Sequence, residues 1–206
     1  MVDRPAEVVL LAAGRSSRMG EPKGLVQVDG RAWLDHQLDA LQGRRVIVVL
    51  GEDRERYEVA IPSLPRRVEV AVNERPERGP FSSLQVGLAR VTPGRPAFVL
   101  PIDVPAASSA VWAELEASLL PTRFAAVPTW GPDARGGHPV LLSSRLVATL
   151  LTRDPESSRL DRELAAAALD PGLDPAGGVA RVPVGDPRVR LNLNAPEDWV
   201  KLTAGQ

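Results

Sequence analysis

A short glycine-bounded loop near the start of the chain carries side chains that could bind phosphate. Residues 8–13 form an aliphatic run long enough for one buried strand, and the loop after it holds Arg15, Arg18 and Lys23 among small residues. Backbone N–H groups and cations at the end of a buried strand are a common way for α/β proteins to hold phosphate. The pattern therefore predicts an anion-binding loop, although an ordinary strand–helix connection has a similar composition.

Lysine is rare in this chain, and one lysine lies in this loop. Only two of the 25 basic residues are lysines, Lys23 and Lys201. A compact ammonium can act as a point charge on a phosphate where a guanidinium is too bulky. We therefore interpret Lys23 as a phosphate ligand, with chance placement as the alternative.

Two nucleotide-binding motifs do not fit the loop. The P-loop of NTPases requires G-x-x-x-x-G-K-[ST], whereas Gly14 is followed here by Gly20 and then by Lys23. The dinucleotide fingerprint G-x-G-x-x-G fails because Ser16 stands in place of its second glycine. The loop therefore differs from those of P-loop NTPases and dinucleotide-binding dehydrogenases.

Two further polar side chains follow apolar runs that are typical of strands. Asn73 follows residues 68–72, and Asp103 follows residues 97–100. Open parallel sheets bind ligands beyond the carboxyl ends of their strands. We therefore expect Asn73, Asp103 and the basic loop to share one rim of a sheet, although Asp103 could instead cap a helix beginning near Ala106.

The composition favours one soluble domain and excludes several kinds of site. The 206 residues include 25 basic and 26 acidic ones, so their balanced charge predicts no nucleic-acid or membrane partner. The absence of cysteine excludes disulfides and thiolate metal sites. The apolar runs are far shorter than the ~20 residues of a membrane span. Residues 1–7 are polar and unlike a signal peptide, so we expect a cytoplasmic protein.

Alternating strands and helices must position these side chains. Apolar runs predict strands at residues 8–13, 46–50, 68–72, 97–100, 124–128, 138–142, 179–184 and 189–193. Helices are predicted at residues 31–42, 52–60, 84–90, 107–119, 143–151 and 159–169. Ser82 and Ser83 are expected to cap the helix at 84–90, and Gly87 to permit close backbone contact. The alternation predicts a single domain, residues 1–206, with a three-layer α/β/α fold around a mostly parallel mixed sheet.

Several segments, in order along the chain, resemble a known enzyme family. They are Leu11-Ala12-Ala13-Gly14 with Arg18-Met19-Gly20 and Pro22-Lys23, Gly79 with Ser82-Ser83-Leu84 and Gly87-Leu88, Asp103-Val104-Pro105, Gly137-His138-Pro139-Val140, and Asn194-Ala195-Pro196-Glu197-Asp198. The set covers nearly the whole chain and resembles the nucleotidyltransferases with the Rossmann-like nucleotide-diphospho-sugar transferase fold. Within that superfamily it is most similar to the molybdenum-cofactor cytidylyltransferase-like (MobA-like) NTP transferases.

The resemblance implies transfer of a nucleoside monophosphate from an NTP to a small phosphate monoester, with release of pyrophosphate. The acceptor phosphate is the nucleophile, so catalysis needs alignment and charge neutralisation rather than a nucleophilic side chain. The implied catalytic residues are Arg18, Lys23 and Asp103. The resemblance also implies Mg²⁺ held by Asp103 and Asn194, and His138 on the acceptor side. The implied nucleotide-binding residues are Leu11, Ala12, Ala13, Gly14, Lys23, Asn73 and Ser83, with backbone N–H groups from Ala12 to Gly14 facing the nucleotide.

The implied partners are CTP and a phosphorylated acceptor such as molybdopterin or a sugar phosphate. The preference for CTP rests on Ala12-Ala13-Gly14, because guanylyltransferase relatives more often carry L-A-G-G at this point. One methyl group near the base excludes purines only if the pocket is tight.

Two departures from the family's pattern leave alternatives open. Similar cytidylyltransferases usually end in D-x-D-T-P, whereas this chain has Asn192 and Asn194 at the acidic positions. An amide oxygen can still bind Mg²⁺, but one fewer negative charge predicts weaker metal affinity. Residues 153–159 lack the glycines of the family's G-D-x-G-A-R, which leaves the acceptor open. The alternative functions are a nucleotide-binding relative with a weakened metal site and a regulatory partner of another cofactor-handling enzyme.

Overall fold

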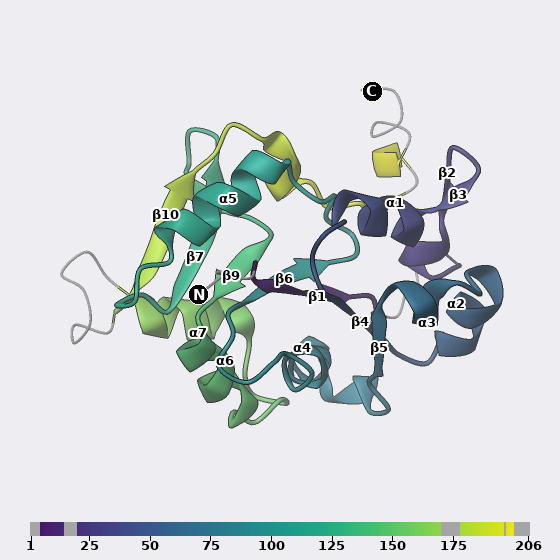
Figure 1. The fold of residues 1–206 in the computed structure, drawn as a ribbon, viewed down its shortest axis with the longest axis horizontal. Helices are drawn as coiled ribbons and strands as arrows, with labels where there is room; N and C mark the ends of the chain where they lie inside the picture. The colour runs from purple at the N-terminus through teal and green to yellow at the C-terminus, as the bar shows by residue number, and fades with distance from the viewer. Residues whose placement is uncertain (1–4, 15–19, 170–177, 196, 200–206) are drawn as a thin grey trace.

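The computed structural model describes residues 5–14, 20–169, 178–195 and 197–199 and arranges them in three layers (Figure 1). The middle layer is an eight-stranded sheet with the order β10-β7-β9-β6-β1-β4-β5, and β8 pairs with β7. Its strands are β1 (Glu7–Leu11), β4 (Val46–Leu50), β5 (Glu69–Val72), β6 (Ala97–Pro101), β7 (Ala125–Trp130), β8 (Arg135–Gly136), β9 (Val140–Leu142) and β10 (Val179–Pro183). A separate hairpin joins β2 (Gln27–Val28) to β3 (Arg31–Ala32).

The sheet is mostly parallel, as the sequence predicts. The central strand β1 pairs in parallel with β4 on one side and with β6 on the other, and β5 continues the parallel order beyond β4. At the other end, β9 runs antiparallel to both β6 and β7. The carboxyl ends of β1, β4, β5 and β6 therefore meet at one rim.

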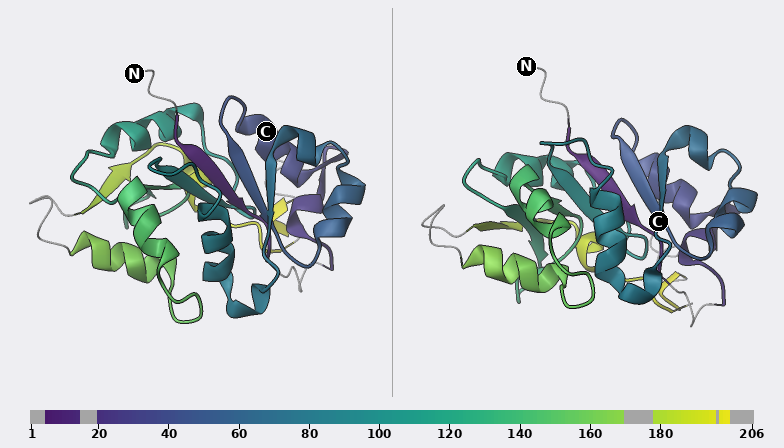
Figure 2. Two further views of the ribbon diagram at one scale, coloured as in Figure 1. Left: turned by 60° about the horizontal axis from the view of Figure 1, so that its bottom comes forward. Right: turned by 90° about the horizontal axis from the view of Figure 1, so that it is seen from below.

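Helices cover both faces of the sheet. They are α1 (Trp33–Ala40), α2 (Arg54–Ala60), α3 (Leu64–Arg67), α4 (Pro80–Leu88), α5 (Ser109–Ser118), α6 (Ser144–Leu151) and α7 (Leu160–Ala168). Figure 1 shows α1 and α5 on one side and α4, α6 and α7 on the other, and the right-hand view of Figure 2 looks onto the second face.

Alternate residues of β1 supply the two apolar cores. Val8 and Leu10 lie in one buried cluster, with side chains from α1 and α5. Val9 lies in the other buried cluster, with side chains from α4 and α6. This alternation is the period of two that a strand buried on both faces requires. No helix of the described residues is long and apolar enough to cross a bilayer.

The C-terminal part of the fold differs from its prediction. Residues 189–193 do not form a strand, because Asp186 and Pro187 start a 3-10 turn, η3 (Pro187–Arg190). The Arg188 N–H donates to Asp186 Oδ1 at 3.0 Å and stabilises the start of this turn. The chain then continues without regular structure toward the rim. Residues 197–199 are helical.

The start of α4 also differs from its prediction. This helix begins at Pro80, after Gly79 with φ of 92° and the short turn η2 (Pro76–Arg78), so Ser82 and Ser83 lie in its first turn and do not cap it. Proline suits the first helical position because its missing N–H would have no intrahelical acceptor there. The prediction of serine caps is therefore wrong.

Gly87 lets α4 lie directly on the sheet, as predicted. A Cβ at this position would overlap Val9 Cγ1 of β1 and lie 2.8 Å from Val49 Cγ2 of β4. The absence of a side chain thus sets the distance between α4 and the two central strands.

We expect Gly87→Ala to lower the free energy of unfolding by about 1–2 kcal/mol, because overpacking costs more than the helix propensity of alanine returns. Urea denaturation of both proteins measures the difference. Gly185→Ala is the matched control, since a Cβ there meets no atom within 4 Å. An unchanged or increased stability of Gly87→Ala would contradict this account of the packing.

Candidate active site

A cleft of about 460 Å³ opens beyond the carboxyl ends of β1 and β6. Its walls come from the segment after β1, the first turn of α4 and the segment after β6, and its volume lies in the range of small-molecule sites. The lining residues are Leu11, Ala12, Ala13, Gly14, Lys23, Pro76, Gly79, Pro80, Ser83, Pro101, Ile102 and Asp103. The predicted rim of the sheet is therefore where the cleft lies.

Lys23 joins three distant segments of the chain at this cleft. Its ammonium donates hydrogen bonds to Asp103 Oδ2 at 2.8 Å and to Asn194 Oδ1 at 2.7 Å. The Lys23 and Asp103 side chains are only 18% and 24% exposed. The structure thus brings together three of the residues that the sequence proposed for catalysis and metal binding.

Helix α1 holds the segment that carries Asp103. Trp33 donates its indole N–H to Ile102 O at 2.7 Å, and Gln37 donates its amide N–H to Val104 O, also at 2.7 Å. Both side chains are buried, so the backbone on each side of Asp103 is fixed. Sequence reasoning missed these two supporting roles. The supporting role of Gln37 could have been predicted from its place on the apolar face of a helix, because a buried amide needs hydrogen-bond partners.

The structure also tests the alternative role of Asp103, in which its side chain caps the helix that follows β6. Helix α5 begins at Ser109 with Ser108 as its N-cap residue, well beyond Asp103. Asp103 therefore does not cap the helix that follows β6, and its carboxylate faces Lys23.

The segment after η3 places Asn194. The Leu193 N–H donates to Asp103 O at 2.8 Å, next to the Asp103 carboxylate. Asp198 Oδ2 accepts the N–H groups of Asn194 and Ala195 at 3.0 and 2.9 Å. These backbone bonds dock the closing segment on the rim and bring the Asn194 amide to Lys23.

Asn73 supports the cleft wall from behind. It is 3% exposed, and its Nδ2 donates to the hydroxyl groups of Ser82 and Ser83 at 2.9 Å each. Its Oδ1 accepts the Arg75 N–H at 3.0 Å. Ser83 lines the cleft, whereas Asn73 does not. The geometry therefore gives Asn73 a supporting place rather than the direct nucleotide contact that the sequence suggested.

The described start of the first loop lies at the cleft. Leu11, Ala12, Ala13 and Gly14 line the cleft, but the Ala12 N–H donates to Val49 O of β4 at 2.9 Å and so belongs to the sheet. Its expected role as a nucleotide donor is corrected accordingly. Arg18 lies outside the described residues, and its catalytic role stays a prediction.

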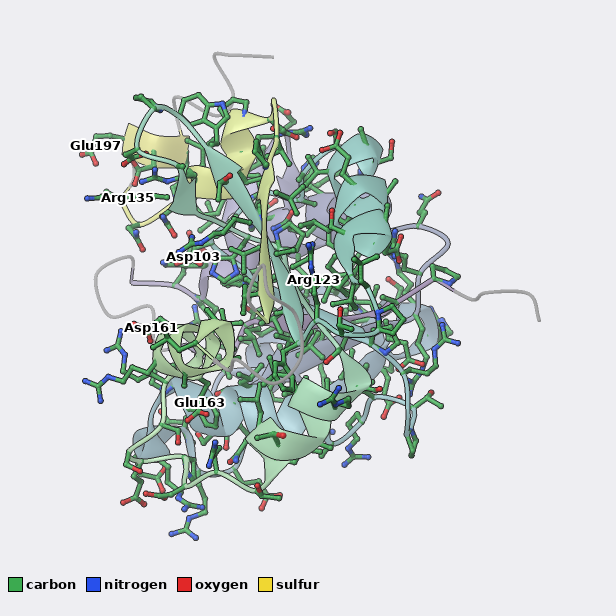
Figure 3. All side chains as sticks on the ribbon, turned by 90° about the vertical axis from the view of Figure 1, so that its left-hand side faces the viewer. Asp103, Arg123, Arg135, Asp161, Glu163 and Glu197 are labelled. Carbon is green, nitrogen blue, oxygen red and sulfur yellow. The ribbon has the colours of Figure 1, made fainter. Side chains whose placement is uncertain are left out.

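His138 lines two smaller cavities, of about 390 and 400 Å³. The first of them shares Leu11, Pro80 and Pro101 with the cleft wall. Figure 3 labels Asp103 and, on α7, Asp161, which lines both smaller cavities. Burial lowers the pKa of His138, against the opposing effects of the Val99 backbone and the Asp103 charge. A neutral imidazole thus borders the space next to the cleft.

The donor set around Lys23 suits a hard divalent cation. No group of three or more His, Cys, Asp or Glu residues that could hold a metal occurs in the described part of the chain. One carboxylate and one amide oxygen, however, already converge on a single cation, the Lys23 ammonium. Mg²⁺ is commonly held by one or two carboxylates together with substrate phosphates and water. Asp103 and Asn194 therefore fit a cation that is shared with a bound nucleotide.

Comparison with known proteins places this chain in a family. Residues 8–170 match the family model described as MobA-like NTP transferase domain. A probable molybdenum cofactor guanylyltransferase of Methanothermobacter thermautotrophicus is 30% identical over 184 residues, which cover 81% of this chain and 90% of that protein. The bifunctional protein GlmU of Mycolicibacterium vanbaalenii is 39% identical over 94 residues, 41% of this chain and 19% of GlmU. The chain thus spans about a fifth of GlmU, and it spans about half of two further guanylyltransferases that it matches.

A solved structure has a similar fold. Rv0371c from Mycobacterium tuberculosis superimposes with a TM-score of 0.77 at 25% identity, over 99% of this chain and 100% of that protein. Its complex with manganese gives a TM-score of 0.72 at 23% identity, over 98% and 100% of the two chains. The chain belongs to the MobA-like NTP transferase family and has the three-layer α/β/α, Rossmann-like fold of nucleotidyltransferases.

Proposed function

We propose that this chain is a metal-dependent nucleotidyltransferase that transfers a nucleoside monophosphate from an NTP to a small phosphate monoester and releases pyrophosphate. The observation that carries the proposal is the hydrogen-bonded set of Lys23, Asp103 and Asn194 at the cleft beyond β1 and β6. A cation beside a carboxylate and an amide can position and neutralise a polyphosphate, which is what this reaction requires.

The reaction uses the acceptor phosphate as its nucleophile. An oxygen of the acceptor attacks the α-phosphorus of the NTP, the bond from that phosphorus to the β-phosphate bridging oxygen breaks, and pyrophosphate leaves with the electron pair. The chain has no cysteine, and the hydroxyl of Ser83 at the cleft accepts a hydrogen bond from Asn73. The protein's part is therefore alignment and charge neutralisation.

Lys23 has the central role in this scheme. Its ammonium neutralises negative charge as it develops on the departing pyrophosphate, and its long stem lets it reach from the rim toward the cleft. A divalent cation held by Asp103 and Asn194 would supply further neutralisation of the phosphate oxygens. We expect Mg²⁺ in this place, and the manganese complex of the related Rv0371c supports a divalent ion.

For the nucleotide we propose GTP instead of the CTP that the sequence suggested. Named relatives are molybdenum cofactor guanylyltransferases, which supports guanylyl transfer and a molybdopterin-type acceptor. The argument for CTP depended on the Ala13 methyl narrowing the pocket. Ala13 is only 9% exposed and packs in the buried cluster with Val9, so its methyl offers little surface to exclude a purine.

A pyrophosphate-release assay tests this proposal, using four NTPs with molybdopterin and a panel of sugar phosphates. We expect turnover with GTP, and we expect Lys23→Ala to lower kcat/KM by about 10²–10³-fold, the usual effect of removing one charge-stabilising donor. Lys201→Ala, which removes the other lysine, should leave the rate unchanged. Tight NTP binding by calorimetry without turnover for any pair would instead indicate a nucleotide-binding protein.

The Asn194→Asp variant tests the metal ligand. A second carboxylate should lower the Mg²⁺ concentration for half-maximal activity by about three- to tenfold, because ligand charge tunes metal affinity. Asn192→Asp is the matched control, since the Asn192 amide bonds to Arg190 O rather than to Lys23. An unchanged metal requirement in Asn194→Asp would count against Asn194 as a ligand.

A further inference from the structure

Tyr57 lies beneath the turn that carries Lys23, although it is 34 positions further along the chain. It belongs to α2, its side chain is 1% exposed, and its hydroxyl accepts the Gly24 N–H at 3.2 Å. Gly24 directly follows Lys23 in the 3-10 turn η1 (Lys23–Leu25). A buried tyrosine outside the cleft wall therefore contacts the backbone next to the ammonium-bearing residue.

The contact between Tyr57 and the turn is unusually close. A Cβ at position 24 would lie 2.7 Å from Tyr57 Oη and 2.8 Å from Tyr57 Cε1. Any side chain at Gly24 would therefore push η1 away from α2. The glycine and the tyrosine together set how near the turn approaches this helix.

Bonds within the turn do not fix its place in the fold. The Leu25 N–H donates to Pro22 O at 2.8 Å, and the Val26 N–H donates to Lys23 O at 3.3 Å. Both bonds join neighbours in sequence, so they shape the turn without relating it to the sheet. Two contacts do relate it to the sheet. Leu25 packs in the same buried cluster as Leu10 of β1, and the bond to Tyr57 ties the Gly24 backbone to a buried side chain of that cluster.

We propose that Tyr57 is a positioning residue for nucleotidyl transfer. Its hydroxyl fixes the backbone of Gly24, and the fixed backbone directs the Lys23 side chain to Asp103 and Asn194 at the cleft. This inference rests on the proposed function and extends the machinery to α2, which contributes no residue to the cleft wall. A lysine stem has several rotatable bonds, so the direction of its backbone decides which places the ammonium reaches.

Tyr57→Phe tests the proposal, because it keeps the ring and removes only the hydroxyl that accepts the Gly24 N–H. We expect kcat for pyrophosphate release to fall about three- to tenfold, the range for loss of one hydrogen bond. The KM for the NTP should change less than kcat, because the cleft wall is untouched. An unchanged kcat would overturn the proposal.

A second readout reports on Lys23 directly and does not need turnover. The chain has only two lysines, Lys23 and Lys201, so protein labelled with ¹³C at lysine Cε and ¹⁵N at Nζ gives two side-chain NMR signals, which Lys201→Arg assigns. In Tyr57→Phe the Lys23 signal should move toward that of free lysine while the Lys201 signal stays in place. A stationary Lys23 signal would contradict the positioning role even if no NTP is turned over, so failure of this inference and failure of the proposed function give different results.

Ser143→Ala is the matched control for a general loss of stability. The Ser143 hydroxyl accepts the Leu146 N–H at 3.2 Å at the start of α6, the same kind of bond at the same length. This variant should lower Tm about as much as Tyr57→Phe and leave kcat and the Lys23 signal unchanged. Equal effects of both variants on the Lys23 signal would mean that destabilisation alone moves it, and would overturn the proposal.

Discussion

The ammonium of Lys23, held between the Asp103 carboxylate and the Asn194 amide, is the interaction on which the candidate site depends. A partly exposed ion pair adds little to the stability of a fold, so its importance is geometric. It joins the segments that follow β1, β6 and η3, and it holds the Lys23 ammonium at the edge of the cleft. The parallel order of β1 and β6 makes this meeting possible, because both strands end at the same rim.

The supports of this interaction come from helices rather than from the cleft itself. Trp33 and Gln37 of α1 fix the backbone around Asp103, and Tyr57 of α2 contacts the backbone after Lys23. Each support is a buried side chain bonded to a main-chain group. A site held in this way keeps its charges at set distances before any ligand arrives, which reduces the reorganisation that catalysis would otherwise require.

The sequence was sufficient to predict those strands whose side chains are buried on both faces of the sheet. Residues 46–50 form the predicted strand because an unbroken apolar run must be covered on both faces, and Asp103 lies at the predicted rim because it follows such a strand. The strand predicted at 189–193 was wrong, because Asp186 and Pro187 start a tight turn whose hydrogen bonds outweigh a weak alternation of apolar residues.

Side-chain direction was the main obstacle to predicting the site. Ala13 lines the cleft, but it also packs in the buried cluster with Val9 and is only 9% exposed, which the order of residues alone does not reveal. Asn73 follows a strand as a ligand-binding residue would, yet its amide is taken by two serines. Which partner a polar group finds depends on tertiary neighbours that spacing alone does not reveal.

The docking of Asn194 has a consequence for the order in which the parts of the candidate site are synthesised. Among the described residues, those that line the cleft all lie at or before position 103, whereas Asn194 is synthesised much later and lies beyond the region that matches the family model. A growing chain on the ribosome therefore has the sequence of the cleft wall well before it has the Asn194 amide that bonds to Lys23. Translation of the intervening segment therefore separates the synthesis of the cleft wall from the synthesis of Asn194, and the hydrogen bond from Lys23 to Asn194 forms only when the segment after η3 docks on the rim.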